Sequence, residues 1–208
     1  MRKPLIVHVE TDPAIIWAGA PPWVGAGFLV PTDADVSMPP TQHCPEWRTW
    51  IRNLGGVDEA MTQVRVTLSA NEDLNVVVDG LRARVHSRKP VPRWRHVICA
   101  VGGADITPKR AEIALDDYAQ PIIRWVNEGG EALPTPTFTL SGSESEMIHV
   151  WARSRSEWIE WTAELLLIID GQRQIIPISD NGDPFITTAA EGAASQHIWA
   201  GGSWEPHL

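Results

Sequence analysis

The chain has 208 residues, of which 43% are hydrophobic and 21% charged, and its net charge is −9. This composition is that of an ordinary globular protein, and the length allows a sizeable core. The negative charge opposes nucleic-acid binding, because such binding needs Lys and Arg to neutralise phosphates. No apolar run approaches the ~18 residues of a membrane span. The apolar run that follows the first basic residues is too short for a signal peptide.

The chain contains two cysteines, Cys44 and Cys99, which lie far apart and form no CxxC motif. A zinc ribbon or a thioredoxin-like site is therefore not supported. His43 precedes Cys44, but no signature of a catalytic cysteine surrounds the pair, so we interpret Cys44 as a residue at a helix end. We expect a cytoplasmic protein with reduced thiols, without a metal or another cofactor.

Within residues 1–44, the stretch PLIVHVE at residues 4–10 alternates weakly, which predicts a strand. The Pro, Gly and Ala residues that follow exclude a long helix and interrupt central sheet pairing. We expect a Pro/Gly-rich N-terminal arm with one or two strands, the second at AGFLV. Trp17 and Trp23 in this arm are candidate binding residues.

Residues 45–54, PEWRTWIRNL, carry the clearest helical pattern in the chain. Pro45 suits the first helical position, and the following glycines suit a left-handed C-terminal cap. We expect Arg48, Arg52 and Asn53 to face water. The apolar side chains recur at i, i+3, i+4 and i+7 and form one face that should pack on a sheet: Trp47, Trp50, Ile51 and Leu54.

After the helix the apolar period changes from 3.6 to 2. Clear alternation is found in TQVRVTLSA, LRARVHSRK and EWIEWTAEL, and shorter runs bounded by turns follow. The apolar run LLLII predicts a strand that is buried on both faces. We therefore predict an all-β fold in which residues 45–190 form an antiparallel β-sandwich, Ig-like or jelly-roll-like, with one short amphipathic helix and extended terminal arms.

Two polar clusters, IIDGQRQII and SDNGDPF, are interpreted as turns. Asp170 and Gly171 suit the two central positions of a type I′ hairpin, and Asn181 and Gly182 tolerate left-handed conformations. The acidic residues at 180–183 lack the spacing and the distal Glu of a calcium loop. The histidines also lack metal-ligand spacing: His8, His86, His96, His149 and His197. No metal site is predicted.

Residues 88–96, RKPVPRWRH, form the one basic cluster, to which Arg82 and Arg84 add. Arg93, Trp94 and Arg95 have the composition of a surface that stacks on bases and contacts phosphates. The acidic balance of the chain favours the other interpretation, a solvated sheet face and loop. We keep these three residues as candidate binding residues for a ligand or partner.

Residues 191–208 lack a period and are rich in small side chains. One interpretation is a C-terminal arm that docks on a partner or a neighbouring subunit through Trp199 and Trp204. The alternative is that the segment folds back over its own sheet, which would also offset the entropy of ordering it. We expect the docking arm.

Four motifs resemble an uncharacterised β-rich domain of actinobacterial proteins, over roughly residues 45–190. They are EWxxWIxxxGGVD, VxVxL, LRARVHSRKP and EWTAELLLIIDGQRQIIPISDNGDPFITT. In those proteins the domain often follows a helix-turn-helix or membrane segment, where this chain has its Pro-rich arm. The resemblance implies no activity. It implies an accessory or sensory module of a regulatory or defence-type system.

No phosphate loop, nucleophile elbow or other catalytic signature is present, so no catalytic residue is predicted. The chain has 11 Trp, and Trp is a frequent anchor at interfaces. The leading hypothesis is a non-catalytic protein-interaction module that binds a partner or self-associates. The alternatives are a small-molecule or carbohydrate binder with a Trp-lined cleft, and a β-fold enzyme acting on a hydrophobic substrate.

Overall fold

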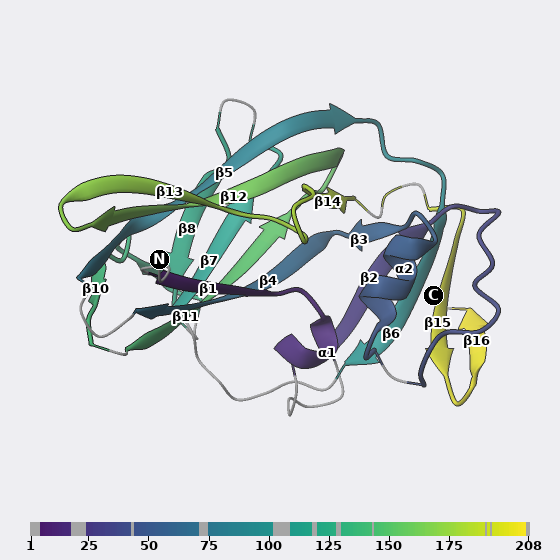
Figure 1. Ribbon diagram of the computed structural model, residues 1–208. Helices are drawn as coiled ribbons and strands as arrows, with labels where there is room; N and C mark the ends of the chain where they lie inside the picture. The colour runs from purple at the N-terminus through teal and green to yellow at the C-terminus, as the bar shows by residue number, and fades with distance from the viewer. Residues whose placement is uncertain are drawn as a thin grey trace.

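The computed structural model shows a β-rich molecule whose described strands form two sheets packed together (Figure 1). The predicted all-β sandwich is confirmed. The structure describes residues 5–17, 24–42, 44–70, 75–101, 109–117, 120–127, 130–142, 144–189, 191 and 193–206.

The first sheet is 6-stranded over the described residues, in the order β1-β4-β11-β7-β8-β9. In β4 the predicted alternation holds, because Val64, Val66 and Leu68 are buried while the residues between them face the other side. Antiparallel pairs join β4 to β1 and β11, whereas β7 runs parallel to β11. The bounds are β1 Leu5–Glu10, β4 Met61–Ala70, β11 Ser145–Arg153, β7 Lys109–Ala114, β8 Ile122–Val126 and β9 Ala132–Leu133.

The second sheet is 10-stranded over the described residues, in the order β10-β5-β12-β14-β3-β2-β6-β15-β16, and β13 also pairs with β12. The pairs β14–β3 and β15–β6 are parallel, so both sheets are mixed and not wholly antiparallel. The bounds are β2 Val24–Val30, β3 Val57–Glu59, β5 Val76–Lys89, β6 Arg95–Val101, β10 Phe138–Leu140, β12 Trp158–Ile169, β13 Gln172–Ile178, β14 Phe185–Thr188, β15 Ser195–Ala200 and β16 Ser203–Pro206.

The described residues bury two apolar clusters. The first core lies between the sheets and includes Leu68, Trp161 and Phe185. The second core lies where helix α2 (Trp47–Asn53) packs on β2 and β6, beside the short helix α1 (Pro13–Ile16) (Figure 1). The molecule is therefore a sandwich whose larger sheet extends beyond the smaller one, and α2 covers the extension.

Helix α2 falls inside the predicted range 45–54 and uses the predicted face. Trp47 and Ile51 are fully buried, and Trp50 and Leu54 pack against the same core. Gly55 has φ 77, as a left-handed C-terminal cap requires. Pro45 lies outside the helix and is not its first residue, because the N-cap is Glu46 with φ 66.

Arg48 contradicts the expectation that the charged residues of this helix face water, because it is only 5% exposed. Its guanidinium turns inward toward a buried aspartate, a partner that the helical period does not reveal. A charge is buried in this way only where it is paired and hydrogen-bonded.

Both polar clusters are turns, as predicted. Asp170 and Gly171 have φ 49 and 76 and join β12 to β13 as a two-residue hairpin. Asp180 and Asp183 exchange backbone hydrogen bonds of 2.8 and 3.1 Å around Asn181, which has φ 55. The second turn thus fixes the direction in which residues 180–183 present their side chains.

The terminal segments are parts of the sheets. The predicted strands of residues 1–44 exist, and β1 pairs with β4 while β2 pairs with β3 and β6. The expectation of a free C-terminal arm is wrong, because β15 pairs with β6 and β16 pairs with β15. The alternative, a tail folded over its own sheet, describes the structure.

Trp199 and Trp204 explain why the tail folds back. Their rings lie 5.1 Å apart, and Trp204 lies 5.7 Å from Trp47 of α2. The Trp204 indole N–H also donates to the backbone oxygen of Val36 at 2.8 Å. Edge-to-face aromatic pairs, and in Trp204 a satisfied indole N–H, are typical of Trp in a core. The two residues therefore complete the second core.

Cys44 and Cys99 form a disulfide between the segment before α2 and β6, so the expectation of reduced thiols is wrong for this structure. Both residues are buried, with 0% and 1% of their surface exposed. The separation of 55 residues gave no sequence signal of the pairing. With Cys44 in the disulfide, this residue has no free thiol that could act as a nucleophile.

Deletion of residues 191–208 should lower the melting temperature, because it uncovers the second core and the edge of β6. Trp204→Ala in the full chain should lower the unfolding free energy by ~2–4 kcal/mol, since it removes a large side chain from that core. Thermal unfolding followed by circular dichroism measures the first effect, and urea titration the second. An unchanged melting temperature in the deletion would show that the tail contributes nothing to folding.

The double variant Cys44→Ala/Cys99→Ala should lose about 4 kcal/mol of stability, because the disulfide closes a loop of 55 residues in the unfolded chain. Urea titration with and without dithiothreitol measures this. The reductant should destabilise the wild type and leave the variant unchanged. Two thiols that react with iodoacetamide in the unfolded, unreduced wild type would contradict the disulfide.

Candidate functional site

Two arginines of α2 lie one helical turn apart and reach the same buried point. Arg48 and Arg52 are spaced i, i+4, so their side chains share one face of the helix. The chain then turns through two glycines into β3, which carries Asp58. The sequence thus brings two cations and one anion together within a dozen residues.

A second carboxylate, from Asp180, completes this ion network. Arg48 binds Asp58 at 3.1 Å and Asp180 at 2.9 Å, and its side chain and that of Asp58 are each 6% exposed. Arg52 contacts the same two carboxylates at 3.4 and 3.3 Å. The Nε and Nη2 atoms of Arg48 bind both oxygens of Asp58, the bidentate geometry that is strongest for an arginine–carboxylate pair.

The surroundings hold the pair in its charged form. Burial would raise the pKa of Asp58, but the charges of Arg48 and Arg52 and hydrogen bonds from Arg48 and Thr62 lower it below its ordinary value. Burial would lower the pKa of Arg48, yet Asp58 and Asp180 raise it above its ordinary value. Neither group exchanges a proton near neutral pH, so the pair has a structural character.

A chain of hydroxyl groups connects the network to the first core. Thr62 donates to Asp58 at 2.8 Å, and its oxygen lies 2.6 Å from that of Thr187. The indole N–H of Trp161 donates to Thr187 at 2.9 Å. The network therefore has contacts with both cores.

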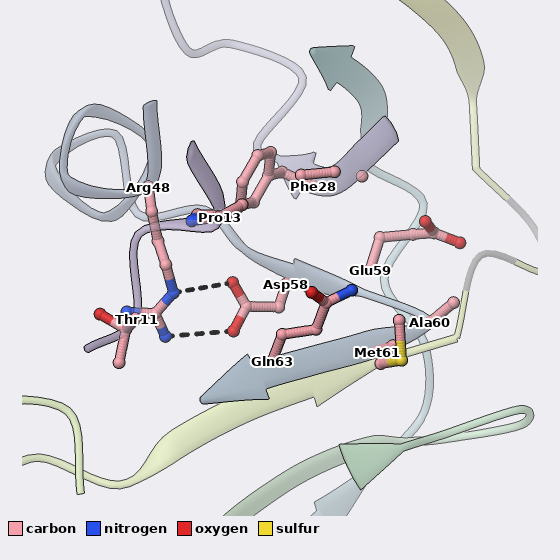
Figure 2. Close-up of a pocket in the computed structure, with 11 residues that line it drawn as sticks. Thr11, Pro13, Phe28, Arg48, Asp58, Glu59, Ala60, Met61 and Gln63 are labelled. Atoms are coloured by element: carbon pink, nitrogen blue, oxygen red, sulfur yellow. Dashed lines mark hydrogen bonds and ion pairs between the residues drawn. The ribbon is translucent and has the colours of Figure 1, made fainter. Parts of the chain in front are cut away.

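A small cavity of about 160 Å³ adjoins the ion pair, where the chain leaves β3 and enters β4 (Figure 2). Figure 2 shows Arg48 reaching to Asp58, Thr11 beside the guanidinium, and Glu59 directed away from Asp58. The cavity is lined by Thr11, Pro13, Ala26, Gly27, Phe28, Arg48, Asp58, Glu59, Ala60, Met61 and Gln63.

Glu59 faces His96 over Gly27. The Glu59 carboxylate lies 3.3 Å from His96 Nε2, and neither ring nitrogen of His96 has a hydrogen-bond partner. A Cβ on residue 27 would lie 2.2 Å from the Glu59 carboxylate and 2.9 Å from His96. Any side chain larger than that of glycine at position 27 would therefore clash with this pair.

A larger, open cleft of about 600 Å³ lies on the other side of Arg48. Its walls are α2 and the turn at residues 180–183, which Asp180 ties to the helix. Both cavities share Thr11 and Arg48, and we call them together the junction cleft. The open part is lined by Thr11, Arg48, Thr49, Arg52, Asn53, Glu160, Asp180, Asn181, Asp183, Pro184 and Ile186.

Of the predicted binding residues in the two terminal segments, those that the structure describes do not line the junction cleft: Trp17, Trp199 and Trp204. Trp17 packs on Trp151 of the first sheet at 5.6 Å and donates its indole N–H to Gln63. Trp199 and Trp204 belong to the second core. Trp23 lies outside the described residues.

The basic cluster is separate from these Trp contacts. The ring of Trp94 packs edge-to-face on Trp158 at 5.3 Å, and Arg95 donates to the backbone oxygen of Thr32 at 3.0 Å. Arg93 is exposed. The structure therefore distributes the predicted binding residues over several places, and their role in binding stays a prediction.

Arg48, Asp58 and Asp180 are the site residues that sequence reasoning missed. The only signal was the acidic turn at residues 180–183, which we interpreted as a turn alone. Arg48 and Asp180 are 132 residues apart, so no local pattern links them.

Comparison with protein-family models, curated proteins and solved structures finds no match for this chain. The resemblance to an actinobacterial β-rich domain therefore stays a prediction. In the part of the chain that the structure describes, no group of three or more His, Cys, Asp or Glu side chains is placed to hold a metal ion. No described helix is long and apolar enough to cross a membrane.

Asp58→Asn should lower the unfolding free energy by ~3–5 kcal/mol, because it leaves the Arg48 charge buried with a weaker partner. Asp183→Asn, in the exposed part of the same cleft, should unfold like the wild type. Urea titration at pH 7 compares the three proteins. Equal stability of Asp58→Asn and the wild type would show that the ion pair is not a structural requirement.

The same variant changes the response to acid. The pKa of Asp58 is lowered in the folded state, so its charged form stabilises the fold above the ordinary carboxyl pKa. This contribution is lost as the pH falls below ~4 and through the lower folded pKa. The wild type should lose stability more steeply than Asp58→Asn over this range, as acid titration followed by Trp fluorescence would show.

Proposed function

We propose that the protein is a non-catalytic recognition module that binds a segment of a partner protein in the junction cleft. One observation carries the proposal: the turn at residues 180–183 is fixed to α2 by the Arg48–Asp180 contact at 2.9 Å. The two walls of the cleft are therefore set before any ligand arrives. Preorganised walls reduce the entropy that binding costs.

The chemistry of the lining suits a polar peptide segment. Thr49, Asn53, Asn181 and Asp183 are exposed in the open part and together offer hydrogen-bond donors and acceptors. Pro184 and Ile186 add apolar surface. A mixed lining of this kind can pair the alternating N–H and C=O groups of a peptide, and its volume of about 600 Å³ lies within the range of ligand sites.

The electrostatics of the cleft support binding over proton transfer. A general acid or base works best with a pKa near the working pH. The pKa of Asp58 is lowered and that of Arg48 is raised, and a hydrogen bond from Lys89 lowers the pKa of Glu160. The pKa values of these three lining groups are therefore shifted further from neutral pH.

The alternatives from the sequence have less support. No Trp lines the described clefts, so a Trp-lined carbohydrate site is not favoured. The charged and amide side chains in the mixed lining also favour a polar segment over a wholly hydrophobic substrate. A small polar molecule in the junction cleft is the competing hypothesis.

The setting of the module is part of the proposal. The resemblance suggests an accessory or sensory role in a bacterial regulatory or defence-type system. The Cys44–Cys99 disulfide favours an oxidising compartment over the cytoplasm that the sequence led us to expect. We also propose self-association as a variant of this function, in which a second copy of the chain supplies the segment that binds in the junction cleft.

Selection from a displayed library of random peptides tests the proposal. Thr49→Trp places a large side chain in the cleft from an exposed helical position, and Gln174→Trp places one on the exposed β13 as a matched control. We expect peptides selected on the wild type to bind the control equally and Thr49→Trp at least about tenfold more weakly, since filling the site removes most of its contacts.

Two results would contradict the proposal. One is a selection in which no peptide is enriched, or in which the enriched peptides bind Thr49→Trp as well as the wild type. The other is a sugar or amino acid that raises the melting temperature of the wild type and not of Thr49→Trp, which would assign the cleft to a small molecule.

A further inference from the structure

The outer face of the first sheet carries a cluster of basic and aromatic side chains at its centre. His149 and Trp151 lie on β11 and point away from the first core, whose residues alternate with them. In the sheet register His149 lies beside Arg65 of β4 and Arg110 of β7. Trp17 packs against both aromatic rings, at 6.4 and 5.6 Å. We call these residues, with Arg153, the outer-face cluster.

The outer-face cluster holds more positive than negative charge. The guanidinium groups of Arg110 and Arg153 lie 4.3 and 5.8 Å from the ring of Trp151. Glu112 pairs with Arg110 at 3.3 Å and also with Arg124 at 3.2 Å. Among the described residues no carboxylate forms an ion pair with Arg65 or Arg153, although Arg65 donates to a backbone oxygen.

Three nitrogen atoms of the cluster are buried without any hydrogen-bond partner: Nε of Arg110, Nε1 of Trp151 and Nε2 of His149. The Arg and Trp atoms can only donate. His149 is 6% exposed, so water does not satisfy its ring from the surface. A buried donor is normally paired, and an unpaired one in a native fold calls for an explanation.

We infer that the outer-face cluster binds a compact oxyanion, a carboxylate or a phosphate, which accepts hydrogen bonds from Arg110 and Trp151 and is balanced by the charges of Arg65 and Arg153. The oxyanion supplies acceptors for the unpartnered donors of Arg110 and Trp151. Access is beside Arg110, whose side chain is 20% exposed, and the partly exposed Trp151. This site shares no lining residue with the junction cleft, although Trp17 donates to Gln63 of the small cavity.

The state of His149 agrees with this assignment. Burial, followed by the charges of Arg65 and Arg110, lowers the pKa of His149 to about 4. The ring is therefore neutral at pH 7 and adds no charge to the cluster. In a chain with a net charge of −9, a local excess of arginine also directs an anion to this face.

Isothermal titration of the full chain with sodium phosphate and, separately, with sodium acetate tests the inference at low ionic strength. Arg110→Gln removes the central cation, and Arg173→Gln makes the same charge change at an exposed position on β13. We expect saturable binding of at least one anion to the wild type and Arg173→Gln. Binding to Arg110→Gln should be roughly tenfold weaker or more, since a hydrogen bond to a charged group is lost.

Trp151→Phe keeps an aromatic ring and removes the N–H donor, so it should also weaken binding by several-fold, with circular dichroism confirming that each variant is folded. Binding of phosphate alone assigns the site to phosphate-bearing ligands, and binding of acetate alone to carboxylates. The inference is overturned if neither anion binds, or if Arg110→Gln binds as tightly as the wild type. Thr49→Trp should bind the anion normally, which separates this test from that of the junction cleft.

Discussion

The buried ion pair between Arg48 and Asp58 constrains the rest of the architecture. Taking both charges out of water costs several kcal/mol per ion, and only close, fully hydrogen-bonded geometry offsets that cost. The bidentate contact at 3.2 and 3.1 Å meets this condition only while α2, β3 and the turn carrying Asp180 keep their positions. Asp58 also lies two residues before Ala60, where the chain passes from the second sheet to the first.

This constraint has a second anchor in the segment before the helix. The Cys44–Cys99 disulfide ties the segment before α2 to β6, while the ion network ties its inner face to β3 and to the turn before β14. Thr62 and Thr187 continue the network to Trp161 in the first core. The helix is thus fixed before its first residue and along its inner face, and the wall that it forms in the junction cleft is held in place.

Local patterns predicted local structure well. The alternation in residues 61–70, the helical period in 47–53 and the Asp170–Gly171 hairpin each depend on neighbours in sequence, and each was found. The buried state of Arg48, the disulfide and the parallel pairing of β15 with β6 depend on residues far along the chain. Helical spacing identified the apolar face of α2. It also predicts that an arginine beside that face, such as Arg48, is exposed to solvent, because the spacing does not reveal a carboxylate partner far along the chain.

The two proposed sites differ in how their charges are compensated. In the junction cleft Arg48 and Arg52 are matched by Asp58 and Asp180, so selectivity there depends on shape and hydrogen bonds. In the outer-face cluster Arg65 and Arg153 lack a carboxylate among the described residues, so binding there depends on charge. Salt screens exposed and partly exposed charges over ~8–10 Å, whereas it affects neutral hydrogen bonds little. Raising the ionic strength should therefore weaken the binding of an anion to the outer-face cluster and leave the binding of a segment in the junction cleft largely unchanged. This contrast follows from whether the arginines of each site are paired with carboxylates.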